Sequence, residues 1–167
     1  VFEKPDVTLL VLDSTALERS LNLALQVLEM TDRVIVCLNL MDEAKKKGIK
    51  VDAGKLAQKL GVPVIPISAR NNDGLDTLSE QLLLMCTGGI RTAPYRMKYN
   101  ERLEEEIAKL ETELKLIVGD EYPARWLAIR FLDGDRKLID TLKQKLAASD
   151  RGGMIYGAAK ALGSTNR

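Results

Sequence analysis

Two short groups of polar residues in this chain have the types and spacing needed to recognise a ligand. Asn-Leu-Met-Asp occupies residues 39–42, directly after an apolar run at residues 34–38, and Ser-Ala-Arg occupies residues 68–70, directly after an apolar run at residues 64–67. An Asn-x-x-Asp sequence by itself occurs by chance about once in a few chains of this length. Its position after one apolar run, with Ser-Ala after the next, makes the combination far more specific.

These residue types suit the recognition of a purine base. The carboxylate of Asp42 can accept two hydrogen bonds from adjacent N–H donors, and guanine offers such a pair on N1 and N2 whereas adenine does not. Asn39 can hold the other edge of the purine or brace neighbouring loops, and the backbone N–H of Ala69 can reach the guanine oxygen. The alternative interpretation is that Asn39 and Asp42 only cap the segment that follows the strand. The Ser68-Ala69 pair favours base recognition.

The segments around these motifs predict a parallel α/β layer. Residues 7–12 (VTLLVL), 34–38 (VIVCL) and 64–67 (VIPI) are short, continuous apolar runs, which is typical of strands buried on both faces of a parallel sheet. The intervening segments have helical spacing, so the order predicts right-handed crossovers. Ligands of such sheets bind beyond the carboxyl ends of the strands, which is where both polar groups lie.

Local signals predict where the helices of this layer begin and end. Thr15 and Glu18 match a capping box for a helix at about residues 16–30, and Asp52 can cap a helix that Gly61 ends. A further helix is predicted at about residues 75–86. Pro66 removes a backbone donor, which predicts that the third strand lies at or near an edge of the sheet.

The composition changes after Gly88-Gly89, which predicts a boundary between a domain at residues 1–89 and a domain at residues 90–167. The second part is predicted to be helical. Its longest helix carries an apolar stripe at intervals of 4, 3, 4 and 3 residues, formed by Leu103, Ile107, Leu110, Leu114 and Ile117. Shorter helices are expected at residues 124–132 and 136–147, followed by a weaker one at residues 152–167.

Two further groups in the helical part are predicted to have structural roles. The apolar and aromatic residues between Trp126 and Leu132 are predicted to pack in a core, with a ligand-binding role as the alternative. The acidic run at residues 104–106 is predicted to be a solvated helix face.

Composition excludes several classes of function. The 25 Lys and Arg residues nearly balance the 24 Asp and Glu residues, so no global field attracts nucleic acid. The chain has no histidine, which removes Ser-His and Cys-His nucleophile pairs. Cys37 and Cys86 lie in apolar segments without metal-type spacing, which predicts reduced core residues of a cytosolic protein, with a disulfide as the alternative. Neither a membrane span nor a signal peptide is evident, so we expect a soluble chain.

The two polar groups resemble the fourth and fifth motifs of the GTP-binding-protein superfamily, which contact the guanine base. Residues 39–52 (NLMDEAKKKGIKVD) and 60–70 (LGVPVIPISAR) closely resemble the ferrous-iron transporter B family, FeoB. Residues 122–135 (YPARWLAIRFLDGD) resemble the helical domain that follows the G domain in that family. The resemblance implies an α/β fold, a partial P-loop-type G domain with a three-stranded parallel sheet, followed by a small all-α, GDI-like helical domain.

The resemblance also implies a set of residues that bind the guanine base, with no catalytic or metal-binding residue among them. The implied residues are Asn39, Leu40, Asp42, Ser68, Ala69 and Arg70. Many small G proteins have Lys where this chain has Leu40, with the Lys stem over the base. FeoB proteins commonly have an apolar residue there, so Leu40 supports the family and implies weak nucleotide affinity.

The motifs that bind phosphate in such proteins are absent from this sequence. It contains no G-x-x-x-x-G-K-[ST] loop, and no D-x-x-G follows an early strand. We therefore expect the chain to be the C-terminal half of a G domain, with the phosphate loop, switch I and Mg²⁺ coordination in a missing N-terminal half. The parent protein is expected to be a GTPase that binds GTP and GDP, whereas this chain alone should hydrolyse no GTP and hold no nucleotide tightly.

The implied function is part of a GTP-dependent ferrous-iron transporter at the cytoplasmic face of the cell membrane. In that family the helical domain is thought to stabilise the GDP-bound state and to relay the nucleotide state to the membrane permease. The expected partners are a guanine nucleotide, the missing half of the G domain and the permease domain. Two alternatives remain, a GTPase of ribosome assembly or tRNA modification, and an interaction module that binds no nucleotide.

The first strand also predicts an association. Residues 7–12 contain neither charge nor proline, and unpaired edges of such strands pair with other chains. We therefore expect self-association through the free edge of this strand, either as a strand-paired dimer or with another segment bent in to cover the edge.

Overall fold

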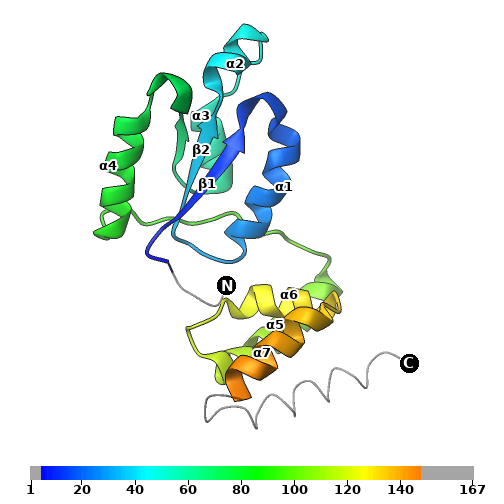
Figure 1. Cartoon of the computed structure of the whole chain (residues 1–167). Helices are drawn as coiled ribbons and strands as arrows, with labels where there is room; N and C mark the ends of the chain where they lie inside the picture. Colours follow the sequence, from blue (N-terminus) through cyan, green and yellow to red (C-terminus); the bar gives the residue numbers. More distant parts are fainter. Residues whose placement is uncertain (1–4, 148–167) are drawn as a thin grey trace. The chain divides into compact units, whose positions relative to one another are not determined.

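The computed structural model describes residues 5–147, which form two compact units (Figure 1). The chain divides between Met97 and Lys98. This division lies several residues after the boundary predicted at Gly88-Gly89, because the segment that follows the two glycines is hydrogen-bonded to the first unit. Within the described residues, no helix combines the length and the apolar character needed to cross a membrane.

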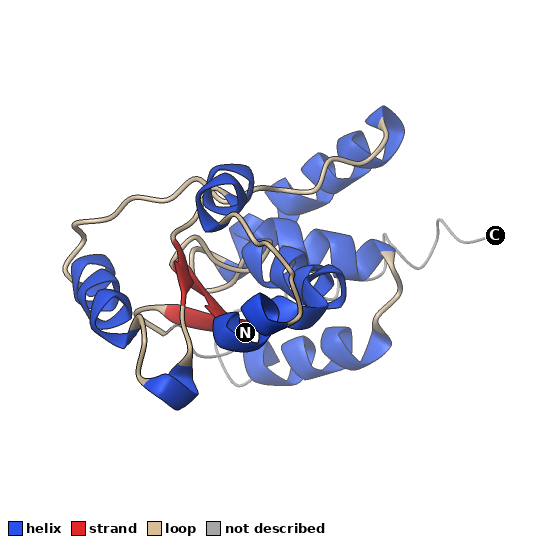
Figure 2. Cartoon of the chain, turned by 90° about the horizontal axis from the view of Figure 1, so that it is seen from above, coloured by secondary structure: helices blue, strands red, loops and turns tan. Residues whose placement is uncertain are grey.

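The first unit is a parallel sheet of three strands with helices on both faces, which confirms the predicted fold class. The strands lie in the order β1-β2-β3 and appear together in Figure 2. The register places Asp13 opposite Asn39, so β1 and β2 end level with each other. The elements in chain order are β1 (Thr8–Asp13), α1 (Leu17–Leu28), β2 (Val34–Asn39), α2 (Met41–Lys46), α3 (Ala53–Leu60), β3 (Val64–Pro66) and α4 (Leu75–Cys86).

Strand β2 is the centre of this unit, since its side chains alternate between two cores. Val34, Val36 and Leu38 pack with α1 and α3 on one face, whereas Ile35 and Cys37 pack with α4 on the other. All five are fully buried. This explains why β2 reads as a continuous apolar run in the sequence.

Strand β1 is covered on one face only. Leu10 and Leu12 are buried, while Leu9 and Val11 are 41% and 54% exposed on the opposite face. Strand β3, with Pro66, forms the other edge of the sheet, as the missing donor of proline predicts.

Some of the predicted helix signals hold and others do not. Asp52 caps α3 by accepting from the N–H of Lys55 at 2.9 Å, and Gly61 ends this helix with φ of +69°, as expected. The capping box at Thr15 and Glu18 is wrong. Asp13 instead accepts from the N–H and the hydroxyl of Thr15, because a short 3-10 turn (Ser14–Ala16) precedes α1. The six-residue helix α2 was not predicted.

Residues 90–97 form an extended strap that is bonded to the first unit. The backbone N–H groups of Ala93 and Tyr95 donate to the carbonyls of Gly61 and Leu60 at 3.0 and 2.8 Å. The N–H of Met97 donates at 2.7 Å to the buried carboxylate of Glu29. The strap passes so close to Gly61 that a Cβ there would stand 1.8 Å from the Ala93 carbonyl oxygen.

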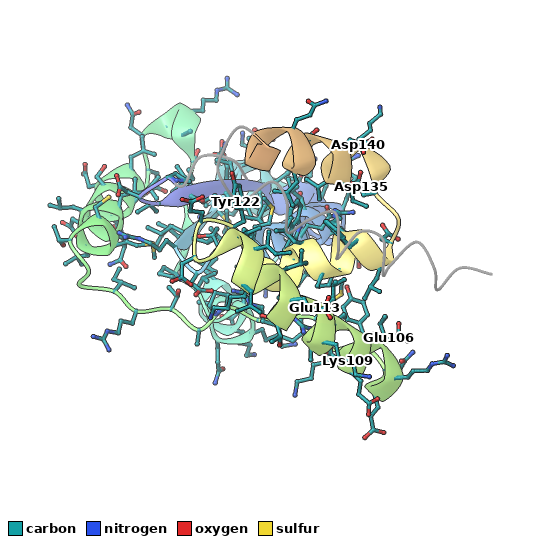
Figure 3. All side chains as sticks on the ribbon, turned by 90° about the horizontal axis from the view of Figure 1, so that it is seen from below. Glu106, Lys109, Glu113, Tyr122, Asp135 and Asp140 are labelled. Carbon is teal, nitrogen blue, oxygen red and sulfur yellow. The ribbon has the colours of Figure 1, made fainter. Side chains whose placement is uncertain are left out.

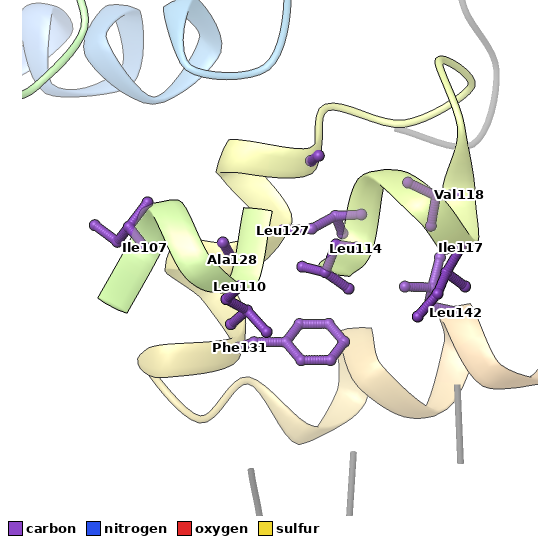
Figure 4. Close-up of a cluster of buried hydrophobic side chains, with 10 residues drawn as sticks. Ile107, Leu110, Leu114, Ile117, Val118, Leu127, Ala128, Phe131 and Leu142 are labelled. Carbon is purple, nitrogen blue, oxygen red and sulfur yellow. The ribbon is translucent and has the colours of Figure 1, made fainter. Parts of the chain in front are cut away.

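As far as residue 147, where the description ends, the second unit has three helices around one core. Helix α5 (Glu101–Val118) is capped by Asn100, whose side chain accepts from the N–H of Leu103. It is followed by α6 (Ala124–Leu132) and α7 (Arg136–Ala147). The core of this unit, drawn in Figure 4, consists of Ile107, Leu110, Leu114, Ile117, Val118, Ala124, Leu127, Ala128, Phe131 and Leu142.

The predicted stripe on α5 is confirmed, with Leu103 packed at the margin of this core and the other members buried in it. The predicted packing role of the segment from Trp126 to Leu132 is confirmed as well, since its apolar residues lie in the core or against it. The helix predicted at residues 152–167 lies outside the described residues.

The surface of the second unit corrects one prediction. Glu106, Lys109 and Glu113 are exposed on α5 (Figure 3), whereas Glu104 is only partly exposed and its carboxylate is held within the chain. Both of its oxygens accept from the guanidinium of Arg125 at 3.0 Å, and Oε1 also accepts from the N–H of Tyr99.

The cysteines also differ from each other. Both thiols are free, Cys37 is buried, and Cys86 is exposed at the end of α4 rather than in a core. The helical spacing that predicts α4 does not place Cys86 on its buried side.

Candidate functional site

The two polar groups singled out in the sequence meet at the carboxyl edge of the sheet. Strand β2 ends at Asn39, and the chain that leaves β3 reaches Ser68 after two residues. The backbone ties these ends together, since the N–H of Ile67 donates to the Leu38 carbonyl at 2.8 Å and the N–H of Met41 donates to the Ile67 carbonyl at 3.2 Å. Residues 26 positions apart are thereby held within hydrogen-bonding distance.

A left-handed residue turns the chain between the strand and the carboxylate. Leu40 has φ of +64° and ψ of +31°, which is uncommon for a residue other than Gly, Asn or Asp. Helix α2 starts at the next residue, and Asp42 therefore lies in its first turn. Asn39 and Asp42 thus leave the end of β2 in positions that both face the loop after β3.

Asp42 accepts hydrogen bonds from two side chains of that loop. The hydroxyl of Ser68 donates to Oδ1 at 2.9 Å, and the amide nitrogen of Asn71 donates to Oδ2 at 3.3 Å. The same nitrogen of Asn71 donates to the Ser68 hydroxyl oxygen at 3.0 Å. Three side chains therefore form a closed network, of which the sequence motifs contain two and lack Asn71.

The charge state of Asp42 follows from these contacts. The hydrogen bond from the Ser68 hydroxyl is the main cause that lowers the pKa of Asp42, and desolvation only partly opposes it. Backbone N–H groups of α2 and the ammonium group of Lys46 lower the pKa further. Asp42 is therefore a carboxylate at neutral pH, able to accept hydrogen bonds and unable to donate them.

Asn39 is held on two sides. Its Oδ1 accepts from the backbone N–H of Ala69 at 3.1 Å. Its backbone carbonyl accepts from the hydroxyl of Ser14, a residue that is 1% exposed at the end of β1. Sequence reasoning did not single out Ser14, although its position directly after a predicted strand was the available signal.

The loop that presents Ser68 and Ala69 closes on itself. Ser68 and Asp73 exchange two backbone hydrogen bonds of 3.0 and 3.2 Å, and a 3-10 turn (Ala69–Asn71) lies between them. Asn72 completes the turn in the left-handed region, with φ of +56°. This closure fixes the direction in which the loop points its backbone donors.

Among the described residues, Arg70 takes no part in the hydrogen bonds that join the other predicted residues. Its side chain is exposed, and within residues 5–147 it makes no hydrogen bond to the Asn39–Asp42 group. Hydrogen bonds bring together Asn39, Asp42, Ser68 and Ala69. Leu40 lies beside them because it follows Asn39 in the chain.

A cavity of about 410 Å³ opens nearby, between the start of α1 and α3, and Lys50, Lys55 and Lys59 are among its lining residues. Its lining includes Ser14, the partner of the Asn39 carbonyl, but none of the residues at 39–42 or 68–71. In the part of the chain that the structure describes, no three His, Cys, Asp or Glu side chains gather as a metal site would require. The edge itself offers hydrogen-bonding groups from Asn39, Asp42, Ser68 and Ala69 together with the apolar side chain of Leu40.

Comparisons with known proteins agree on one family. The model of ferrous iron transport protein B matches residues 1–82, and the model of the FeoB cytosolic helical domain matches residues 99–155. A fusion of Fe(2+) transport protein A with the Fe(2+) transporter FeoB, from Porphyromonas gingivalis, is 34% identical over 138 residues. The alignment covers 81% of this chain and 16% of that protein, so the chain spans a small part of this relative.

Solved structures agree with the sequence comparisons. The cytosolic domain of the T. maritima FeoB iron transporter in its apo form superimposes with a TM-score of 0.72 at 29% identity, covering 94% of this chain and 67% of that chain. A GDP form of the same domain gives a TM-score of 0.71 at 32% identity, covering 95% of this chain and 63% of that chain.

The family models cover both units in the order in which they occur, and the relatives extend across the junction. This sets aside the alternative of a GTPase from ribosome assembly or tRNA modification. The chain belongs to the ferrous iron transport protein B (FeoB) family, and it comprises the sheet that carries the Asn-x-x-Asp and Ser-Ala motifs together with the cytosolic helical domain.

Proposed function

We propose that the carboxyl edge of the sheet recognises the guanine base of GTP or GDP in a ferrous-iron transport protein. One observation carries this proposal. The Asp42 carboxylate, in the turn that follows the central strand, is ionised and accepts a hydrogen bond from Ser68, which follows the neighbouring strand. A carboxylate fixed in this way is suited to the two adjacent N–H donors of guanine, which adenine lacks.

The other residues take supporting roles in this proposal. The N–H of Ala69 is the donor for the guanine oxygen, and Asn39 Oδ1, its present partner, shares or yields it on binding. Leu40 lies against the base as an apolar surface, and Arg70 is available to more distant groups of the nucleotide. Because these contacts reach only the base, we expect this chain to bind guanine nucleotides no more tightly than roughly millimolar.

Exchanging the acceptor for a donor tests the proposal. The ¹⁵N-labelled chain is titrated with GMP and with XMP, whose base has an oxygen in place of the N2 amino group, and the NMR shifts give both Kd values. Asp42→Asn is expected to reverse the preference, changing the Kd ratio roughly tenfold or more, because hydrogen bonds to a charged group are lost. Asp76→Asn removes an exposed carboxylate from the first turn of α4 and serves as the control. An unchanged ratio in Asp42→Asn removes Asp42 from the site.

We further propose that the helical unit relays the nucleotide state to a membrane iron permease in a longer protein at the cytoplasmic face of the membrane. The family membership supports this, since the P. gingivalis relative is named as a Fe(2+) transporter. In a full-length protein that contains this chain, adding GDP should then change amide exchange in α5, α6 and α7. Exchange rates that are the same with and without GDP would contradict the relay.

Self-association through β1 is a separate proposal. In the described residues β1 pairs with β2 only, and Leu9 and Val11 beside its free edge are exposed. Because charged residues block edge pairing, Val11→Lys should shift a dimer to monomer in light scattering. Leu10→Lys is unsuitable, since Leu10 is buried and its replacement would damage the core. A wild-type chain that stays monomeric at high concentration rejects the association.

A further inference from the structure

Asn71 lies outside both sequence motifs, yet its side chain contacts a residue from each of them. Its amide nitrogen donates to Asp42 Oδ2 at 3.3 Å and to the Ser68 hydroxyl oxygen at 3.0 Å. Asn71 is the last residue of the 3-10 turn and is itself exposed, whereas Ser68 is 2% exposed. The contact to Asp42 therefore comes from a side chain that the core does not fix.

The chemistry of Asn71, Ser68 and Asp42 determines which group donates and which accepts in each hydrogen bond. An amide nitrogen carries two hydrogens and can only donate, and an ionised carboxylate can only accept. Asn71 occupies an acceptor position of the Ser68 oxygen, which leaves the hydroxyl proton of Ser68 for Asp42 Oδ1 at 2.9 Å. Both carboxylate oxygens are thus held by neutral donors, and hydrogen bonds linked in this way strengthen one another.

The same network leaves the carboxylate able to bind a ligand. A carboxylate has about four acceptor positions, and Ser68 and Asn71 take one on each oxygen. Each oxygen keeps acceptor capacity, which a bidentate pair of N–H donors requires. The terminal torsion of an Asp side chain is intrinsically broad, so a single bond from Ser68 would leave the plane of the carboxylate poorly defined.

We propose that Asn71 is a positioning residue, which fixes the plane of the Asp42 carboxylate so that both oxygens meet the N1–H and N2–H donors of guanine. The inference rests on the proposed function, because it names a residue through which that site gains its selectivity. Asn71 acts through Asp42 and makes no contact with the base.

Two purines that differ only at N2 test this role. IMP lacks the exocyclic amino group of GMP, so the ratio of their Kd values reports the bidentate contact. Asn71→Ala should lower the preference for GMP over IMP by roughly three- to tenfold, the range expected for one hydrogen bond. Asn72→Gly is the matched control, because it removes the same carboxamide one residue further on and keeps the positive φ found there.

The outcomes separate this inference from the proposed function. A wild-type chain that prefers GMP and an Asn71→Ala variant with the same preference would overturn the positioning role alone. Equal weakening of GMP and IMP binding would also overturn it, because that result reports general damage to the loop. A wild-type chain with no preference for GMP over IMP would overturn guanine recognition itself, and with it this inference.

The ligand-free chain provides a second readout. The side-chain NH₂ signals of Asn71 should move in the NMR spectrum of Asp42→Asn and stay in place in that of Asp76→Asn. Signals that do not respond to Asp42→Asn would show that the contact is absent in solution, which would overturn the inference whether or not a purine binds.

Discussion

Both units contain a carboxylate that accepts several hydrogen bonds from distant residues, Asp42 in one and Glu104 in the other, and the two networks differ in kind. In the helical unit, Glu104 accepts from both guanidinium nitrogens of Arg125 and from the backbone N–H of Tyr99. In the α/β unit, Asp42 accepts from the neutral side chains of Ser68 and Asn71. An arginine fork neutralises the carboxylate and uses both oxygens, whereas neutral donors orient it and leave its charge available.

This difference distinguishes a polar cluster with a structural role, at Glu104, from one suited to bind a ligand, at Asp42. Glu104 links the start of α5 to α6 across the rim of a helical core, and its charge is satisfied within the chain. Asp42 stands in the first turn of α2, just beyond the central strand, and no arginine fork holds it among the described residues. Its charge is therefore free to complement the N–H donors of the proposed ligand. Depressed pKa values alone do not separate the two groups, because the pKa is lowered in both.

The largest effect is expected in the core of the helical unit. Leu114 is 1% exposed and Leu116, two residues further along α5, is 81% exposed. Leu114→Ala should destabilise the helical unit by about 2–5 kcal/mol, because it leaves a cavity, and Leu116→Ala should change stability by less than about 0.5 kcal/mol. Urea unfolding followed by the fluorescence of Trp126, the only tryptophan, measures both variants.

The same experiment tests whether the units are separate. The buried thiol of Cys37, whose pKa desolvation raises to about 11, reports opening of the α/β unit through its labelling rate. In Leu114→Ala the labelling of Cys37 should be unchanged, with Cys86→Ser as the background to exclude the exposed thiol. Cys37 labelling that accelerates together with the loss of the Trp126 signal would mean that the two units unfold as one.

The next largest loss of stability is expected in the α/β unit, where Gly61 contacts the strap at residues 90–97. Gly61 and Gly48 have nearly the same φ, +69° and +71°, but a Cβ at Gly61 meets the Ala93 carbonyl and one at Gly48 meets nothing within 4 Å. Both Ala variants bear the cost of a left-handed backbone. Gly61→Ala should cost about 2 kcal/mol more than Gly48→Ala, because it also displaces the bonds of Ala93 and Tyr95. Faster amide exchange at these two residues in Gly61→Ala alone is the expected sign, and equal effects of the two variants would contradict it.

Glu104 should give the helical unit a characteristic loss of stability at acid pH. Arg125 is the main cause that lowers the pKa of Glu104 to about 2, well below its unfolded value of about 4.3. The stability that this depressed pKa provides is present above the unfolded pKa and is lost as pH falls through the folded pKa. Glu104→Gln should therefore remove part of the fall in Trp126-monitored stability between about pH 4.5 and pH 2. Glu105→Gln, at the adjacent exposed residue, should keep the wild-type profile, and identical profiles for both variants would reject the role of Glu104.

The smallest effect concerns Asp42 itself. Since the Ser68 hydroxyl is the main cause of its lowered pKa, Ser68→Ala should move the pKa of Asp42 up toward its ordinary value. An NMR titration of the Asp42 carboxyl carbon follows this change. Thr77→Ala, which removes an exposed hydroxyl from α4, is the control. A pKa that does not rise in Ser68→Ala would show that the carboxylate is held by charge rather than by neutral donors.

The sequence was most informative where one physical cause dominates. Burial on both faces makes β2 a continuous apolar run, and the side-chain cap of Asp52 with the left-handed Gly61 defines α3. The capping box predicted at Thr15 was wrong, because a 3-10 turn precedes α1 and Asp13 caps that turn. Helix α2 was missed because six residues with consecutive lysines carry no apolar period.

Contacts between distant residues are what the sequence did not show. The strap looked like the start of a second domain, because its bonds to Leu60 and Gly61 involve backbone atoms that leave no pattern in residue types. Glu104 looked solvated, since its partner Arg125 is 21 positions away. Asn71 was overlooked for the same reason, as its contact with Asp42 depends on how the loop after β3 folds. The role of the motif residues in base recognition stays a prediction.

The left-handed backbone at Leu40 limits which amino acids can replace it. Asn72, the other non-glycine residue with positive φ in the described chain, is of a type that tolerates this conformation, whereas Leu is not. A saturation scan should therefore show an unusual substitution spectrum at position 40. Glycine and asparagine would preserve folding yet remove the apolar surface proposed to lie against the base, and valine or isoleucine would keep an apolar surface yet strain the turn. Selection at this position has to meet two demands that few side chains satisfy together, which makes it a sensitive marker of function within the site.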